Sequence, residues 1–237
     1  MYLLNRRTVS KAKPYLLLHC NGADESTTFT DNSPEGHTVT AVGGAQIDTA
    51  QSKFSGASGL FDGDGDYLTV AGGDFNLTTN FSMECFVRFA DVTDNTTQNL
   101  LGFDDDTTAG AWEFFTGGNC DSLFFRVLDD TPTTIVTLTA ASLGLANDIW
   151  YHLLACKVGS EYGLYVGGIQ KAHVSDASTH AITGTLYVGA AHGAADTELN
   201  GWLDEIRIVA GNPFSAAPVA GLTDKIQVPQ QPYPSWS

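Results

Sequence analysis

The sequence is 237 residues long and 43% hydrophobic, with 25 glycines, a composition that suits one large all-β domain with many short turns. Its net charge is −16, and residues 14–237 alone carry −20, because 27 acidic residues face only seven basic ones there. So acidic a body repels nucleic-acid phosphates, and no apolar run is long enough for a transmembrane helix. We therefore expect neither nucleic-acid binding nor membrane insertion.

Strand signals follow one another at short intervals along the chain, with almost no helical periodicity. Within residues 81–89, Met83, Cys85, Val87 and Phe89 occupy alternate positions and predict one buried face. Short connections favour antiparallel neighbours, so the pattern predicts an all-β, two-sheet antiparallel jelly-roll sandwich. The expected strands are 15–20, 38–42, 59–61, 67–70, 81–90, 100–103, 112–116, 123–128, 134–139, 150–158, 161–166, 169–174, 185–189 and 202–209.

Composition divides the chain into three parts. Residues 1–14 form a basic arm that contains Arg6, Arg7, Lys11 and Lys13 but no acidic residue. Residues 15–211 hold the strand signals and form the sandwich. Residues 212–237 are rich in proline, which predicts an extended tail that lies on the body or on a neighbouring molecule.

The last strand, 202–209, carries an aspartate within an apolar pattern. A period of two puts Asp204 on the face of the strand that also holds Trp202, Ile206 and Ile208. The opposite face then holds Leu203, Glu205, Arg207 and Val209. A buried carboxylate is too costly without a partner, so Asp204 must accept hydrogen bonds or bind a cation.

The cysteines point to a reducing compartment. Cys20, Cys85 and Cys156 lie in strand-like runs and Cys120 lies in a loop, with no C-x-x-C spacing that would favour zinc. Free thiols and the lack of a signal peptide after Met1 predict folding in a reducing cytosol. The sequons at Asn76, Asn80 and Asn95 are then chance matches.

Several segments together resemble a known fold family. They are residues 16–24, 29–40, 54–63, 150–153 and 201–207, and the last of these reads GWLDEIR. In this order they resemble the laminin-G-like group of concanavalin A-type jelly rolls, over roughly residues 15 to 211. Such domains are frequent in the tail fibres, tail tips and head surfaces of tailed phages. The resemblance therefore implies a non-enzymatic phage virion surface protein, a head decoration or tail adhesin, exposed on the virion surface.

Attachment to other structural subunits is the expected mode of action. Terminal segments without a core of their own can order against a partner. We expect such contacts from the arm or the tail, with other virion proteins or with symmetry mates in a homo-oligomer or symmetric array, and host-surface glycans as a further ligand. The expected docking residues are Arg6, Arg7, Lys11, Lys13, Tyr233 and Trp236.

The resemblance also implies a cofactor, because similar jelly rolls often bind one Ca²⁺ between the first long loop and the last body strand. Asp31 and Asp204 are the matching carboxylates, and the backbone of residues 32–37 offers further oxygen ligands. The alternative is that Asp204 only accepts hydrogen bonds from loop amides.

Three other acidic or polar motifs have structural interpretations. Residues 62–66, DGDGD, begin like an EF-hand loop, but Tyr67 stands where that loop needs glycine, which favours a hairpin turn. Residues 104–106 are three aspartates typical of a solvated loop tip. His152 alternates with apolar residues, which favours a hydrogen-bonded structural histidine.

Two other function classes stay open. A free lectin-type carbohydrate-binding module would need exposed aromatic side chains, and Trp112, Phe114, Tyr162 and Tyr165 are the candidates, although a buried position would look the same in the sequence. A glycoside hydrolase would need two neighbouring carboxylates. The Glu-x-Asp-x-x-Glu strand of jelly-roll glucanases is missing, so the residues favour hydrolysis least. The glutamates Glu84, Glu113 and Glu198 each stand singly.

Overall fold

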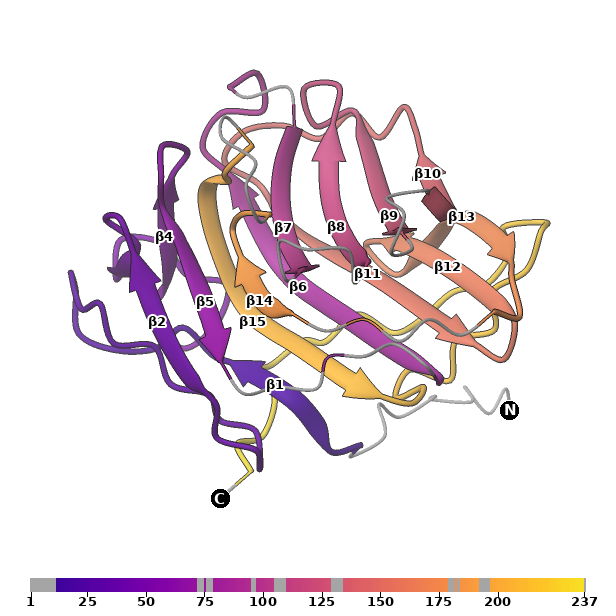
Figure 1. Ribbon diagram of the computed structural model, residues 1–237. Coiled ribbons are helices and arrows are strands. Elements are labelled where there is room, and N and C mark those ends of the chain that lie inside the picture. The colour runs from indigo at the N-terminus through magenta and orange to yellow at the C-terminus, as the bar shows by residue number, and fades with distance from the viewer. Residues whose placement is uncertain are drawn as a thin grey trace, which may run out of the picture.

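The computed structural model describes residues 12–71, 75, 79–94, 97–104, 110–128, 134–178, 182, 184–191 and 197–236. Within these residues the chain forms fifteen β-strands and no helix, so none of them forms a helix able to cross a membrane. The strands build two antiparallel sheets stacked face to face (Figure 1). The predicted all-β jelly-roll sandwich is therefore confirmed.

The first sheet has eight strands. β15 (Asn200–Ala210) lies near its centre, with β6 (Phe81–Phe89) on one side. On the other side β4 (Ser58–Asp62) pairs with the first half of β15, and β1 (Pro14–Leu18) pairs with the second half. Beyond β4 comes β3 (Gln46–Asp48). Beyond β6 the order is β11 (Trp150–Val158), β12 (Glu161–Val166) and β13 (Ile169–Ser175).

The second sheet has seven strands, all antiparallel to their neighbours. Its order is β10 (Thr134–Ala140), β9 (Ser122–Leu128), β8 (Ala111–Gly117), β7 (Thr97–Asp104), β14 (Thr185–Val188), β5 (Tyr67–Ala71) and β2 (Thr38–Val42).

The main core lies between the sheets. Met83, Cys85, Val87 and Phe89 of β6 all point into it, as their alternation predicts. Burial of each side chain of this kind stabilises the fold by about 1.5–3 kcal/mol. The polar end of one large core side chain is also satisfied, because Trp112 Nε1 donates a hydrogen bond to the Phe75 carbonyl at 3.1 Å. Cys20, Cys85, Cys120 and Cys156 are free and buried, as expected.

A β-bulge in β15 overturns the predicted faces of residues 202–209. The pairing with β6 shifts between Asp204 and Arg207, and Glu205 takes a positive φ of 51°. The extra residue reverses the alternation, so Leu203 and Ile206 both face the core. Asp204 lies on the outer side by alternation with Leu203, and it does not share a face with Ile206 and Ile208, because the bulge that follows it returns those two residues to the core side.

The proline-rich tail covers part of that outer side. Phe214, Ala216 and Ile226 pack on Leu154, Cys156 and Tyr165 of β11 and β12, forming a second, smaller core. Ile226 N–H donates to the Gly168 carbonyl at 2.9 Å, which extends the edge of the sheet into the tail. The tail thus lies on the body of its own chain.

A substitution at Gly201 tests how closely β15 packs between its neighbouring strands. A Cβ at this residue would lie 2.3 Å from the Arg88 carbonyl oxygen, and φ is +154°. We expect Gly201→Ala to lower the free energy of unfolding by roughly 2–4 kcal/mol, since neither flanking strand can move away. Urea denaturation measures this. Gly22→Ala is the control, because its Cβ would make only an ordinary 3.4 Å contact with Ile47, and an equal loss in both variants would contradict the prediction.

Candidate functional site

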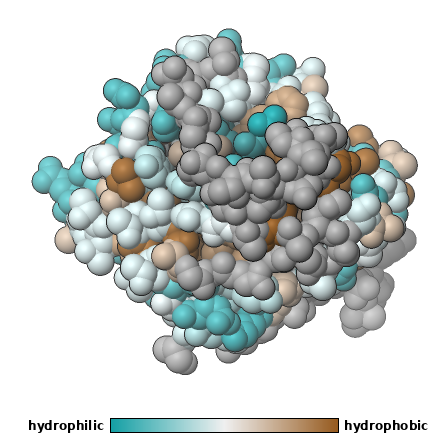
Figure 2. All heavy atoms as spheres, in the orientation of Figure 1, coloured by the Kyte–Doolittle hydropathy of each residue, from teal (hydrophilic) through white to brown (hydrophobic). Residues whose placement is uncertain are grey.

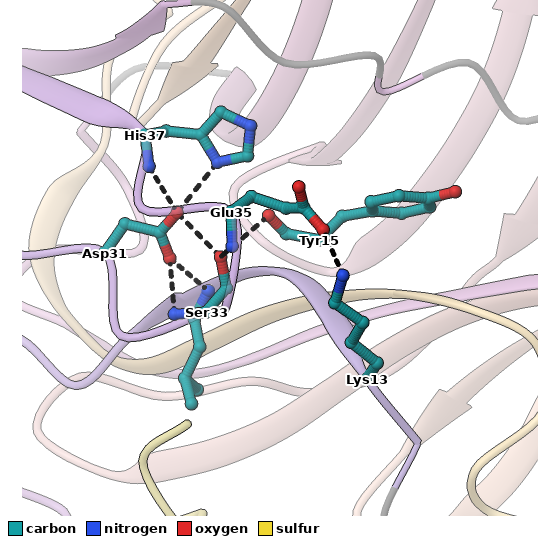
Figure 3. Close-up of polar contacts among 7 residues, drawn as sticks. Lys13, Tyr15, Asp31, Ser33, Glu35 and His37 are labelled. Atoms are coloured by element: carbon teal, nitrogen blue, oxygen red, sulfur yellow. Dashed lines mark hydrogen bonds and ion pairs between the residues drawn. The ribbon is translucent and has the colours of Figure 1, made fainter. Parts of the chain in front are cut away.

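Asp31 is surrounded by hydrogen-bond donors (Figure 3). Its Oδ1 accepts from the N–H groups of Leu17 at 3.0 Å and Ser33 at 2.9 Å. Its Oδ2 accepts from the Ser33 hydroxyl at 2.8 Å and the His37 N–H at 2.9 Å, and lies 2.7 Å from His37 Nδ1. Burial alone would raise the pKa of Asp31, but the hydrogen bonds from His37, Ser33 and Leu17 outweigh it and lower the pKa. The carboxylate fixes the 31–37 loop against β1.

Asp204 holds a different loop. Its Oδ2 accepts from the N–H groups of Lys53 at 2.9 Å and Phe54 at 3.0 Å, which is the loop-amide arrangement considered above. Its Oδ1 is buried and has no hydrogen-bond partner. Burial raises the pKa of Asp204 to about 7, and the nearby charge of Glu205 acts in the same direction.

The two predicted calcium ligands therefore serve separate loops. Nowhere in the described part of the chain do three His, Cys, Asp or Glu side chains gather as a set of metal ligands. The donors around Asp31 occupy both of its oxygens, whereas Asp204 Oδ1 still has a free lone pair that suits a cation or a proton. The calcium site remains a prediction.

A buried charged cluster links the sheet to the tail. Glu84 of β6 accepts from Arg207 Nε at 2.7 Å and from the Tyr233 hydroxyl at 2.6 Å, and lies 2.8 Å from His152 Nε2. Burial alone would raise the pKa of Glu84, but the charge of Arg207 and the hydrogen bonds from His152 and Tyr233 lower it. His152 is thus a hydrogen-bonded structural histidine, as predicted.

Glu205 makes a second link to the tail. Its Oε2 accepts from the Tyr233 N–H at 2.9 Å, and its Oε1 lies 2.8 Å from His19 Nδ1. The other ring nitrogen of His19 lies 3.2 Å from the Ser235 hydroxyl. The tail end is therefore fixed to β15 and β1 by buried polar groups rather than by apolar packing alone.

The predicted docking residues have different surroundings. Tyr233 is buried in its own chain, where the Arg207 guanidinium lies 3.6 Å from its ring centroid. Trp236 is half-buried, and its N–H donates to the Asn32 carbonyl at 3.1 Å. Lys13 is exposed and pairs with Glu35 at 2.7 Å (Figure 3). Arg6, Arg7 and Lys11 lie outside the described residues.

The four aromatic candidates for a sugar platform belong to the buried alternative. Trp112, Phe114, Tyr162 and Tyr165 are all buried, each at most 2% exposed, so none can stack on a ligand. The strand residues next to the first two point the other way, onto the outer face of the seven-stranded sheet.

That outer face carries an aromatic and charged group on β8 and β9. Phe115 and Phe124 are directly opposed, half-buried and stacked, with ring centroids 4.9 Å apart. One row along, Glu113 and Arg126 form an ion pair. The Arg126 guanidinium also lies 5.0 Å from the Phe115 ring centroid and is 40% exposed. We call Glu113, Phe115, Phe124 and Arg126 the β8–β9 patch.

The surroundings of the patch are mixed in polarity. Tyr67 and Tyr187 form another ring contact at 5.9 Å on β5 and β14. Between the two aromatic pairs, Ala190 and Ala191 lie close above Gly102, where a Cβ would meet them at 3.3 Å. Figure 2 shows brown apolar residues among teal hydrophilic ones on the side of the molecule seen in Figure 1. Such a surface can stack on a ligand and hydrogen-bond to it.

The acidic motifs are structural where they are described. Residues 62–66 form a tight turn, in which Asp66 accepts from the Gly44 and Asp62 N–H groups. The hairpin interpretation is wrong, because the turn joins β4 of the eight-stranded sheet to β5 of the seven-stranded sheet, and these two strands do not pair. In the aspartate run, residue 104 ends β7, and residues 105 and 106 lie outside the described part.

Asp204 makes the stability depend on pH. Because its pKa is raised to about 7, the folded state keeps a proton that the unfolded state loses near pH 4, so stability falls as pH rises from 4 to 7. We expect Asp204→Asn to flatten this slope and to add up to about 4 kcal/mol to the free energy of unfolding at pH 8. Urea denaturation at pH 4 to 8, with calcium or chelator, measures it. Calcium-dependent stability that Asp204→Asn abolishes would favour the metal ion instead.

Comparisons with known proteins agree with this architecture. The family model described as the concanavalin A-like lectin/glucanases superfamily, Laminin_G_3, matches residues 62–220. A search of curated protein sequences finds no match.

Similar solved structures include binding domains of botulinum neurotoxins. The serotype D binding domain has 13% identity and a TM-score of 0.64, over 84% of this chain and 49% of that chain. The type G receptor binding domain has 12% identity and a TM-score of 0.64, over 85% and 49%. The neurotoxin DC binding domain in complex with SialylT has 14% identity and a TM-score of 0.60, over 84% and 48%.

This chain spans about half the length of those domains, and at such identity the likeness shows the fold alone. The family match, in contrast, covers more than half of the present sequence. Together with the two stacked antiparallel sheets, it shows that the chain belongs to the concanavalin A-like lectin/glucanase superfamily.

Proposed function

We propose that this protein is a non-enzymatic, lectin-type binding protein whose β8–β9 patch holds a glycan. The observation that carries the proposal is the patch itself: two stacked, half-buried aromatic rings beside an exposed guanidinium, on the outer face of the sheet. Sugar rings present apolar C–H faces and rims of hydroxyls. Phe115 and Phe124 offer apolar contact, and Arg126 and Glu113 offer donors and acceptors for hydroxyls.

The comparisons support a binding role. The matched superfamily includes lectins as well as glucanases, and the similar structures are named as binding domains, one of them in complex with SialylT. Glycan binding by this chain is our inference from those names and from the patch.

The carboxylates also favour binding over hydrolysis. A glycosidase needs one carboxyl group as acid and a second as nucleophile or base. Glu84 is enclosed under the tail by Arg207 and Tyr233, and Glu113 is paired with Arg126. Both are therefore committed to structural partners.

We further propose that the protein acts on a phage virion surface, after folding in the host cytoplasm, where it attaches to other structural subunits. The basic arm is the better docking element, because Tyr233 already serves the fold of its own chain. The chain has a net charge of −16, so repulsion between its acidic bodies would keep particles dispersed. The basic arm would instead be attracted to acidic surfaces of partner proteins.

Glycan binding can be tested on an array of bacterial surface polysaccharides with the purified full chain. We expect Phe124→Ala and Arg126→Ala each to weaken binding about tenfold or more, since stacking and a hydrogen bond to a charged group each contribute over 1 kcal/mol. Tyr15→Ala is the matched control, because Tyr15 is an exposed aromatic on β1, in the other sheet. The proposal fails if no glycan binds, or if the control weakens binding as much as the patch variants.

Virion attachment predicts a different phenotype. Replacement of Arg6, Arg7 and Lys11 by alanine should leave the melting temperature unchanged and abolish incorporation, because only the charges of the arm are lost. The copy number of the protein in purified phage particles, measured by quantitative mass spectrometry, tests this. Wild-type occupancy of the triple variant would overturn docking through the arm, and absence of the wild-type chain from particles would overturn the virion role.

A further inference from the structure

A cavity of about 480 Å³ lies at one end of the eight-stranded sheet, separate from the β8–β9 patch. It opens where the start of β6, the end of β11 and the end of β15 meet the segment after β13. The described residues that line it are Thr79, Asn80, Lys157, Gly159, Ala177, Ala210 and Gly211. The volume falls within the range of about 300–1,000 Å³ typical of small-molecule sites.

Small residues keep this cavity open. Gly159 and Gly211 have φ values of +64° and +118°, and a Cβ at either position would meet no atom within 4 Å. Two further lining residues are alanines. The walls are therefore mostly backbone, and backbone conformations that favour glycine hold them in place.

Lys157 is the one charged side chain among the described lining residues. The residue is only 3% exposed, and its Nζ donates to the Ser178 carbonyl at 2.6 Å and lies 4.8 Å from the Tyr162 ring centroid. Burial lowers the pKa of this amine, and the charge of Asp176 opposes that effect. One oxygen of Asp176 already accepts the Ser178 N–H at 2.6 Å. The ammonium group has three N–H donors, and the Ser178 carbonyl uses one of them.

Neutral polar groups complete the lining. Asn80 Oδ1 accepts the Gly159 N–H at 2.8 Å, which orients the Asn80 side chain and leaves its NH₂ group as a donor. Thr79 adds a hydroxyl group, whose contact with the Asn80 carbonyl is long, at 3.4 Å. A fixed cation beside neutral donors matches a small ligand that carries one carboxylate and several hydroxyl groups.

We propose that this cavity, which we call the Lys157 pocket, binds an acidic monosaccharide unit such as a uronic acid. The ammonium group of Lys157 pairs with the sugar carboxylate, and Thr79 and Asn80 bond to its hydroxyls. The pocket is a second site, so it can hold ligand whether or not the β8–β9 patch binds a glycan.

The test is a titration of the ¹⁵N-labelled full chain with galacturonate, galactose and inorganic phosphate, followed by amide NMR shifts. We expect galacturonate to move the signals of Gly159 and Gly211 and to bind about tenfold or more tightly than galactose, because only the acid offers a charged partner. Lys157→Met keeps the aliphatic contact with Tyr162 and should lose this preference. Lys171→Met, an exposed change of equal charge on β13, should keep it.

Three results would overturn the proposal. Galacturonate that leaves the Gly159 and Gly211 signals in place in the wild-type chain refutes it without any variant. Phosphate that binds as well as galacturonate would make the pocket an inorganic anion site. Equal losses in Lys157→Met and Lys171→Met would show nonspecific attraction. Binding to the glycan array that Phe124→Ala abolishes is binding at the β8–β9 patch. A negative array result therefore does not affect the interpretation of the NMR titration of the Lys157 pocket.

Discussion

Because of the β-bulge at Glu205, the outer side of the eight-stranded sheet must provide partners for two buried carboxylates. By adding one residue to β15, the bulge places Glu205 on the same outer side as Asp204, the acidic residue before it. Carboxylates at the middle of a sheet need partners, because an unpaired buried charge is costly. The 53–54 loop serves Asp204, and the tail and His19 serve Glu205. The packing of the tail end against this side of the sheet is thus a consequence of one backbone irregularity.

Because the tail packs on the eight-stranded sheet, the two sheets differ in what their outer sides contact. The outer side of the eight-stranded sheet is occupied by the tail, whose Tyr233 completes the Glu84 and Arg207 cluster. Breaking such a cluster would leave a buried charge without its partner, so the tail is held more firmly than its proline content alone suggests. On the outer face of the seven-stranded sheet, the side chains of the proposed glycan site project from paired strands. A site on strands is better fixed than one on loops, which suits the recognition of a rigid sugar ring.

The sequence predicted the sandwich because alternation in strands such as β6 reports directly on burial. The sequence did not predict which residues are buried in strands where both alternating sets of positions are apolar. Phe114–Phe115 and Phe124–Phe125 are adjacent pairs, and composition alone cannot say which member is buried. The charged neighbours held the answer: Glu113 and Arg126 lie two residues from Phe115 and Phe124, so they share a face with them. The bulge at Glu205 had no such marker, since a positive φ at a glutamate follows from tertiary contacts rather than from local preference.

Electrostatics then distinguishes the two candidate sites. In the β8–β9 patch the charge of Arg126 is balanced by Glu113, so the patch suits uncharged sugars, which lose little by approaching an acidic protein. In the Lys157 pocket the ammonium group contacts a carbonyl and an aromatic ring, with the charge of Asp176 nearby. An acidic sugar approaching this chain meets repulsion from a net charge of −16, which salt screens beyond about 8 Å, whereas the short-range pairing with Lys157 is screened far less. Local pairing with a buried ammonium group can therefore outweigh the overall charge.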